Sequence, residues 1–163
     1  MDWQIPLLGA VAVFLAFMLW KARPAQTRTR GQRAEHRQRM TELESKALAA
    51  SSPDERAALL SDAAEECAQA GDVRRASAMF QKAIEANTGS VETVRRAVLV
   101  LAPFPNALSN VLWRLLALAP WSGPSREAVA LSLDELAKLY AGSLGNETRS
   151  QALMHARHLL GPG

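Results

Sequence analysis

Residues 57–90, AALLSDAAEECAQAGDVRRASAMFQKAIEANTGS, carry the strongest structural pattern in this sequence. In the second half, apolar residues at i, i+4, i+7 and i+8 mark one face of a helix, at Ala76, Phe80, Ala83 and Ile84. The first half has a matching stripe at Leu59, Leu60, Ala63, Ala64, Cys67 and Ala68. Small residues dominate both stripes, and Ala70-Gly71-Asp72 separates them. We therefore predict two closely packed antiparallel helices.

The spacing resembles one tetratricopeptide repeat, a helix–turn–helix unit of about 34 residues. Counted from Ala57, the turn glycine of the family falls on Gly71, and its small, aromatic and small positions fall on Ala76, Phe80 and Ala83. This sequence departs from the family on the first helix, where Leu60, Ala64 and Cys67 replace tryptophan, glycine and tyrosine, and Thr88 replaces the closing proline. The resemblance covers about a fifth of the chain.

The resemblance also implies a binding surface. In tetratricopeptide domains the first helix of each pair lines a groove for a partner protein. Carried over to this chain, the implied partner-binding residues are Ala58, Ser61, Asp62, Glu65 and Gln69. This wall is small and mildly acidic, which suits a peptide of basic character. Outside the repeat, Trp121 in a Pro/Gly turn is a further candidate partner contact, because a partly exposed indole is a common binding anchor.

Two more helical pairs are expected after the repeat, at 91–102 with 107–119 and at 125–140 with 147–160. The middle pair is apolar on most of its surface, so we expect neighbours on both sides and a buried Trp113. In the last pair Ala152, Ala156 and Leu159 should face inward. No alternating strand pattern is present. The predicted fold is all-α, with a transmembrane helix and a tetratricopeptide-like solenoid of about three hairpins over residues 51–163.

Helix boundaries are also predicted by local signals. Ser52-Pro53 has the residues preferred just before and at the start of a helix, and Asp72 suits the start of the next one. Gly89 is expected as a left-handed cap at the end of that second helix. Asn106 is expected to cap the helix that begins at Ala107.

Residues 1–21 are predicted to be a membrane anchor. The run from Trp3 to Trp20 has no charge and is just long enough for a hydrocarbon core of about 30 Å, with an indole at each end. The alternative, a cleaved signal peptide, would need a basic start and small residues before the cut. Basic residues follow the run rather than precede it, so we expect a single-pass protein of the plasma or inner membrane with its N-terminus outside and its C-terminal domain cytoplasmic.

Residues 22–50 are predicted to be a basic juxtamembrane linker followed by a helix over 32–50, with Met40, Leu43, Ala47 and Leu48 on one face. Candidate contacts to anionic lipid head groups are Lys21, Arg23, Arg28, Arg30 and Arg33. Each could contribute about 1 kcal/mol near the surface. These bases could instead act only as a topology signal. Nucleic-acid binding is a weaker alternative, because no aromatic residue is interleaved for base stacking.

The sequence contains no pattern that predicts catalysis. It lacks a phosphate-binding glycine loop, and Cys67, the single cysteine, lies in an apolar stripe. We therefore expect no enzyme, no cofactor and no metal. The favoured hypothesis is a membrane-anchored scaffold that binds other proteins. The alternatives are an obligate subunit or assembly factor of a membrane complex, and a membrane-tethered nucleic-acid binder.

Overall fold

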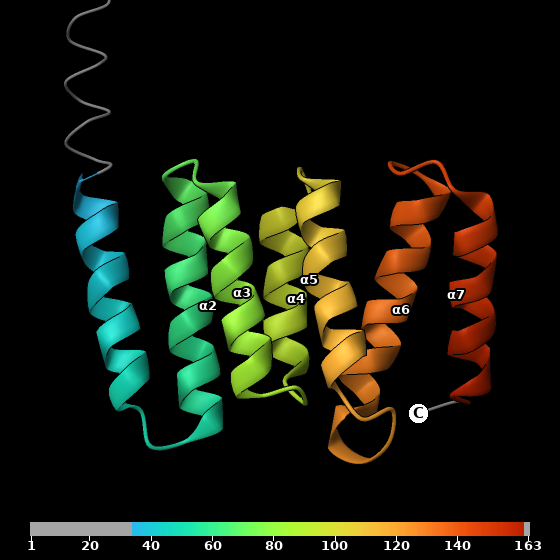
Figure 1. The fold of residues 1–163 in the computed structure, drawn as a ribbon, viewed down its shortest axis with the longest axis horizontal. Coiled ribbons are helices and arrows are strands. Elements are labelled where there is room, and N and C mark those ends of the chain that lie inside the picture. Colours follow the sequence, from blue (N-terminus) through green and yellow to red (C-terminus); the bar gives the residue numbers. More distant parts are fainter. Residues whose placement is uncertain (1–33, 162–163) are drawn as a thin grey trace, which may run out of the picture. The chain divides into compact units, whose positions relative to one another are not determined.

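The computed structural model describes residues 34–161 (Figure 1). The predicted anchor at 1–21 and the lipid-contact candidates from Lys21 to Arg33 lie outside the described residues. Within residues 34–161, no helix has the length and apolar content needed to cross a membrane.

The described chain is all-helical, as predicted, and contains no strand between residues 34 and 161. A helix over 34–49 comes first. The elements that follow are α2 (Pro53–Gln69), α3 (Val73–Ala86), α4 (Val91–Leu101), α5 (Pro105–Leu118), the short 3₁₀ helix η1 (Gly123–Ser125), α6 (Arg126–Ala141) and α7 (Glu147–Leu159).

The compact unit begins at His36 and not near residue 51. Helix 34–49 belongs to it because Met40 and Ala47 are buried in the same core as Leu60 and Phe80. The predicted boundary between juxtamembrane helix and folded domain therefore falls inside the packed structure. Leu48, expected on the same face as Met40, is 84% exposed. It lies one residue beyond Ala47 and so about 100° around the helix, away from the core.

Four helices begin with a side-chain cap of the same kind. Ser52, Asp72, Ser90 and Asn146 each accept a hydrogen bond from the backbone N–H three residues later. Such a bond satisfies one of the free N–H groups of the first turn. The predicted start signals at Ser52 and Asp72 are confirmed.

Two of the predicted boundary signals are wrong. Helix α5 begins at Pro105, and Phe104 occupies the cap position without a side-chain hydrogen bond, so Asn106 is already inside the helix. Gly89 is not left-handed. The side chain of Asn87 instead accepts the Gly89 N–H at 2.8 Å. Left-handed glycines of the tight turns between paired helices are Gly71, with φ +80°, and Gly145, with φ +58°. Gly123 and Gly161 are also left-handed.

The helices pack in two layers. In one layer α2 contacts α4 and α4 contacts α6, while in the other α3 contacts α5 (Figure 1). Helix α4 also contacts α3 and α5, so the middle pair has neighbours on both sides, as predicted. The closest pairing, α2 with α3, buries small side chains without measurable exposure at Ala63, Ala64, Ala76 and Ala83, and Phe80 fills the remaining space.

Two predicted faces differ from the structure. Trp113 is 41% exposed rather than buried, although its Nε1 donates to the Tyr140 hydroxyl of α6 at 3.1 Å. In α7 the buried side chains are Ser150 and Leu153, while Ala152 is exposed and Leu159 is 74% exposed. The inward stripe of α7 thus runs through residues 150, 153 and 156, and only Ala156 of the predicted stripe belongs to it.

We predict that the buried thiol of Cys67 makes the free energy of unfolding depend on pH in the alkaline range. Burial raises its pKa to about 11, and the nearby carboxylates of Asp72 and Glu44 add to the rise against the opposing charge of Arg75. Since the unfolded thiol ionises near 9.0, the contribution of the neutral thiol is complete below that value. As the pH rises toward 11 this contribution is lost, and the free energy of unfolding should fall by roughly 2–3 kcal/mol.

Urea unfolding of the chain and of Cys67→Ala, measured from about pH 8 to about pH 11, tests this expectation. The wild-type free energy of unfolding should fall more steeply than that of the variant. Equal slopes would show that the thiol does not carry the effect.

Candidate functional site

The candidate binding surface is the outer face of α2. Of the residues implied by the resemblance, Ala58 and Gln69 are exposed, and Asp62 and Glu65 are partly exposed. Ser61 is not part of this surface. Its side chain is fully buried, and its hydroxyl donates to the Ala57 carbonyl at 2.8 Å. The outer stripe of α2 follows the spacing 58, 62, 65 and 69, and residue 61 falls on the inner side of it.

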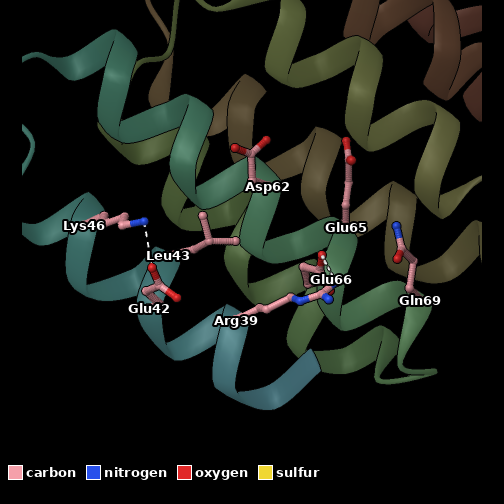
Figure 2. A pocket seen from close by; sticks show the side chains of 8 residues that line it. All are labelled: Arg39, Glu42, Leu43, Lys46, Asp62, Glu65, Glu66 and Gln69. Carbon is pink, nitrogen blue, oxygen red and sulfur yellow. Dashed lines mark ion pairs between the residues drawn. The ribbon is translucent and has the colours of Figure 1, made fainter. Parts of the chain in front are cut away.

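A pocket of about 380 Å³ opens between this face and helix 34–49 (Figure 2). Helix 34–49 lines it with Arg39, Glu42, Leu43 and Lys46. Helix α2 lines it with Asp62, Glu65, Glu66 and Gln69. Three of the five residues that the resemblance implied on α2 therefore share one pocket. The contribution of helix 34–49 was not predicted, because the sequence pattern assigned that helix to the juxtamembrane segment.

Ion pairs hold the two walls of the pocket in place. Glu66 of α2 contacts Nδ1 of His36 at 2.5 Å and the guanidinium of Arg39 at 3.9 Å. On helix 34–49 Lys46 contacts Glu42 at 2.8 Å, one turn away. Figure 2 shows Arg39 reaching across to Glu66. The lining has four carboxylates and two cations, so its side chains leave an excess of negative charge.

Arg96 of α4 reduces that excess. Its Nε donates to Glu65 at 2.7 Å and its Nη2 donates to Asp62 at 2.5 Å. Burial lowers the pKa of this guanidinium, but the two carboxylates more than offset the effect and raise it above its ordinary value. The wall is therefore less acidic than predicted. A sequence signal did exist, since Asp62 and Glu65 are three residues apart and so lie on one face of α2.

The charged contacts continue along the same layer of helices. Arg95 of α4 lies 3.7 Å from Glu127 of α6, and Asp134 of α6 pairs with Arg157 of α7 at 3.3 Å. Leu99, one turn after Arg95 and Arg96, is 77% exposed. The outer face of α4 therefore presents an apolar side chain next to charged ones.

Trp121 is partly exposed, as predicted, and its Nε1–H donates to the Leu116 carbonyl at 3.1 Å. It does not line the pocket. A cluster that the sequence did not predict lies around Tyr140 of α6. Its hydroxyl accepts from Trp113 Nε1 at 3.1 Å, and its ring lies under the guanidinium of Arg149. The hydrogen bond with Ser109, helped by those from Trp113 and Arg149, lowers the pKa of Tyr140 although burial opposes the change.

Comparison of the chain with protein-family models, curated proteins and solved structures gives no match. Between residues 34 and 161, no group of three or more His, Cys, Asp or Glu side chains is arranged to hold a metal ion. The geometry of the pocket and of the neighbouring helix faces is therefore the basis for a functional proposal.

We predict that Arg96 stabilises the α2–α4 contact far more than its neighbour Arg95 stabilises the α4–α6 contact. Arg96 is only 20% exposed and binds two carboxylates, whereas Arg95 and Glu127 are largely exposed and 3.7 Å apart. Arg96→Gln should lower the free energy of unfolding by about 1–2 kcal/mol. Arg95→Gln should change it by less than about 0.5 kcal/mol. Urea titrations measure both, and equal effects would contradict the expectation.

Proposed function

We propose that this protein is a membrane-anchored scaffold whose helical domain, a short stack of tetratricopeptide-like hairpins, binds another protein. The observation that supports it is the pocket between helix 34–49 and α2, which collects Asp62, Glu65 and Gln69 of the resemblance-implied wall. The two-layer packing of α2–α6 is consistent with a solenoid of paired helices.

The partner surface that fits this pocket is polar and of basic character. Four carboxylates face two cations in the lining, and the Gln69 amide is exposed beside them. Lys and Arg side chains of a partner could exchange with the ion pairs that now involve Glu66 and Glu42. Leu99 on α4 would add an apolar contact on the same layer of helices. Such a mixture of polar rim and isolated apolar contacts is common in non-obligate interfaces.

The anchor in this proposal is the uncharged run from Trp3 to Trp20. The bases that follow it favour retention of the C-terminal side in the cytoplasm. The same bases supply the proposed contacts to anionic lipid head groups. Nucleic-acid binding by this segment remains the weaker alternative, and a steep loss of affinity with salt would be its signature.

A photo-crosslinking residue placed at Gln69 of the full chain in its native membrane tests the scaffold proposal. We expect a discrete crosslinked protein whose yield falls when Glu42→Lys reverses a charge of the pocket lining, since Glu42 pairs with Lys46 of its own helix and not with another element. The matched control places the crosslinker at His155, an exposed residue of α7. The same product from both positions, or none from Gln69, would count against the pocket, and a full chain found outside the membrane fraction would count against the anchor.

The exposed apolar side chains of the middle pair favour a second function, that of an obligate subunit. Four large apolar side chains of α4, α5 and their connection are exposed, namely Leu99, Phe104, Trp113 and Leu118. Exposed large apolar residues are candidates for contacts with a partner protein. In this case the full chain purified alone in detergent should aggregate during size-exclusion chromatography and become monodisperse only with a co-purifying protein.

A further inference from the structure

We propose that the face of α2 and α3 beneath helix 34–49 is a helix-binding surface. Helix 34–49, called the resident helix below, occupies this surface and can be displaced from it. The external ligand would be an amphipathic helix of a partner protein that carries the same pattern of groups as the resident helix. This surface shares Glu66 with the pocket wall considered above but otherwise lies beneath the resident helix.

The resident helix is held by few apolar contacts. Met40 and Ala47 are buried, and Leu43 is partly buried, at the spacing i, i+3 and i+7. The neighbouring residues Arg37, Gln38, Thr41, Ser45 and Leu48 are exposed. By comparison, α3 buries Ala76, Met79, Phe80, Ala83 and Ile84. Since burial of apolar surface is the main source of stability, helix 34–49 is the more weakly attached element.

Charges at both edges of the surface define which helix fits. On the α3 side, Arg75 and Lys82 donate to the two carboxylate oxygens of Glu44 at 3.3 and 3.2 Å. On the α2 side, Glu66 contacts His36 at 2.5 Å. A cationic edge on α3 thus faces Glu44, and the anionic Glu66 on α2 faces the guanidinium of Arg39 at 3.9 Å beside the imidazole of His36. These contacts fix the direction and register of the bound helix.

These contacts give the pattern expected of a partner helix. The resident helix presents a basic group at His36, an apolar group four residues later at Met40, a carboxylate after four more at Glu44, and a small apolar group at Ala47. The ion pairs are partly exposed to solvent, and exposed pairs contribute only about 0–1 kcal/mol each. A partner with the same charges and larger apolar residues could therefore compete with the resident.

The short connection to α2 favours the resident helix over an external helix. Only residues 50–52 separate the resident helix from α2. Arg56 of α2 also holds its end, since Nε donates to the Ala47 carbonyl at 3.2 Å and Nη2 to that of Ala50 at 3.1 Å. A tethered occupant has a high effective concentration. Only chains with the resident helix undocked can bind an external helix, so the apparent affinity is the intrinsic affinity multiplied by the undocked fraction. Weakening the attachment of the resident helix should increase that fraction and with it the apparent affinity.

A labelled peptide of residues 34–50, AEHRQRMTELESKALAA, is a defined probe for this surface. Fluorescence anisotropy would measure its binding to the full chain in detergent as wild type, Glu44→Gln and Glu35→Gln. Glu44 contacts α3, whereas Glu35 of the same helix is exposed and takes part in no ion pair of the described residues. We expect the peptide to bind Glu44→Gln at least about fivefold more tightly than wild type, with Glu35→Gln within about twofold of wild type.

A second pair of variants covers the case in which Glu44→Gln does not fold, as judged by circular dichroism. Met40→Ala shortens the buried side chain of the resident, and Leu48→Ala changes an exposed one. Peptide binding should increase only for Met40→Ala, and hydrogen exchange of amides 36–49 should accelerate only in that variant. Equal peptide binding by each variant and its control, or no binding to any of them, would overturn the proposal and make helix 34–49 a permanent part of the core.

Discussion

The close contact between α2 and α3 is the constraint on which the rest of the structure depends. Alanine side chains at 63, 64, 76 and 83 are fully buried there, so the two helices can approach closely. The left-handed Gly71 allows the chain to reverse within a short turn. A larger side chain at any of these alanines would have to displace its neighbours in a densely packed core. The later helices and helix 34–49 build on this pair.

Charged pairs then relate each helix to the next. Glu44 pairs with α3, Arg96 joins α4 to α2, and Arg114 of α5 joins Glu85 of α3 at 2.7 Å. Farther along the layer of α2, α4 and α6, Arg95 faces Glu127, and Asp134 pairs with Arg157. Most of these pairs are partly exposed, so their energetic contribution is modest. Their value is specificity, because a helix shifted by one turn would leave charges without their partners.

The helical content and several helix starts could be predicted because they depend on local signals. Side-chain caps at Ser52 and Asp72 and the turn at Gly71 act within a few residues of sequence. The exposed faces were harder to predict. Leu48, Trp113 and Leu159 are apolar and yet exposed, because the direction of an entire helix face is decided by its neighbours and not by composition. The pocket depended on a contact between helix 34–49 and α2 that no local pattern reveals. Arg96 shows the same limit, since its pairing with two carboxylates more than thirty residues away follows from the packing of α4 on α2.

The construction of the pocket from two separate elements has a thermodynamic consequence. One wall, with Arg39, Glu42, Leu43 and Lys46, comes from helix 34–49, and the other comes from α2. Any ligand that contacts both walls gains its full set of contacts only while that helix is docked. Binding of such a ligand therefore stabilises the docked helix by the same free energy by which docking of the helix strengthens binding of the ligand. Occupants of the pocket and competitors of helix 34–49 would consequently be mutual antagonists.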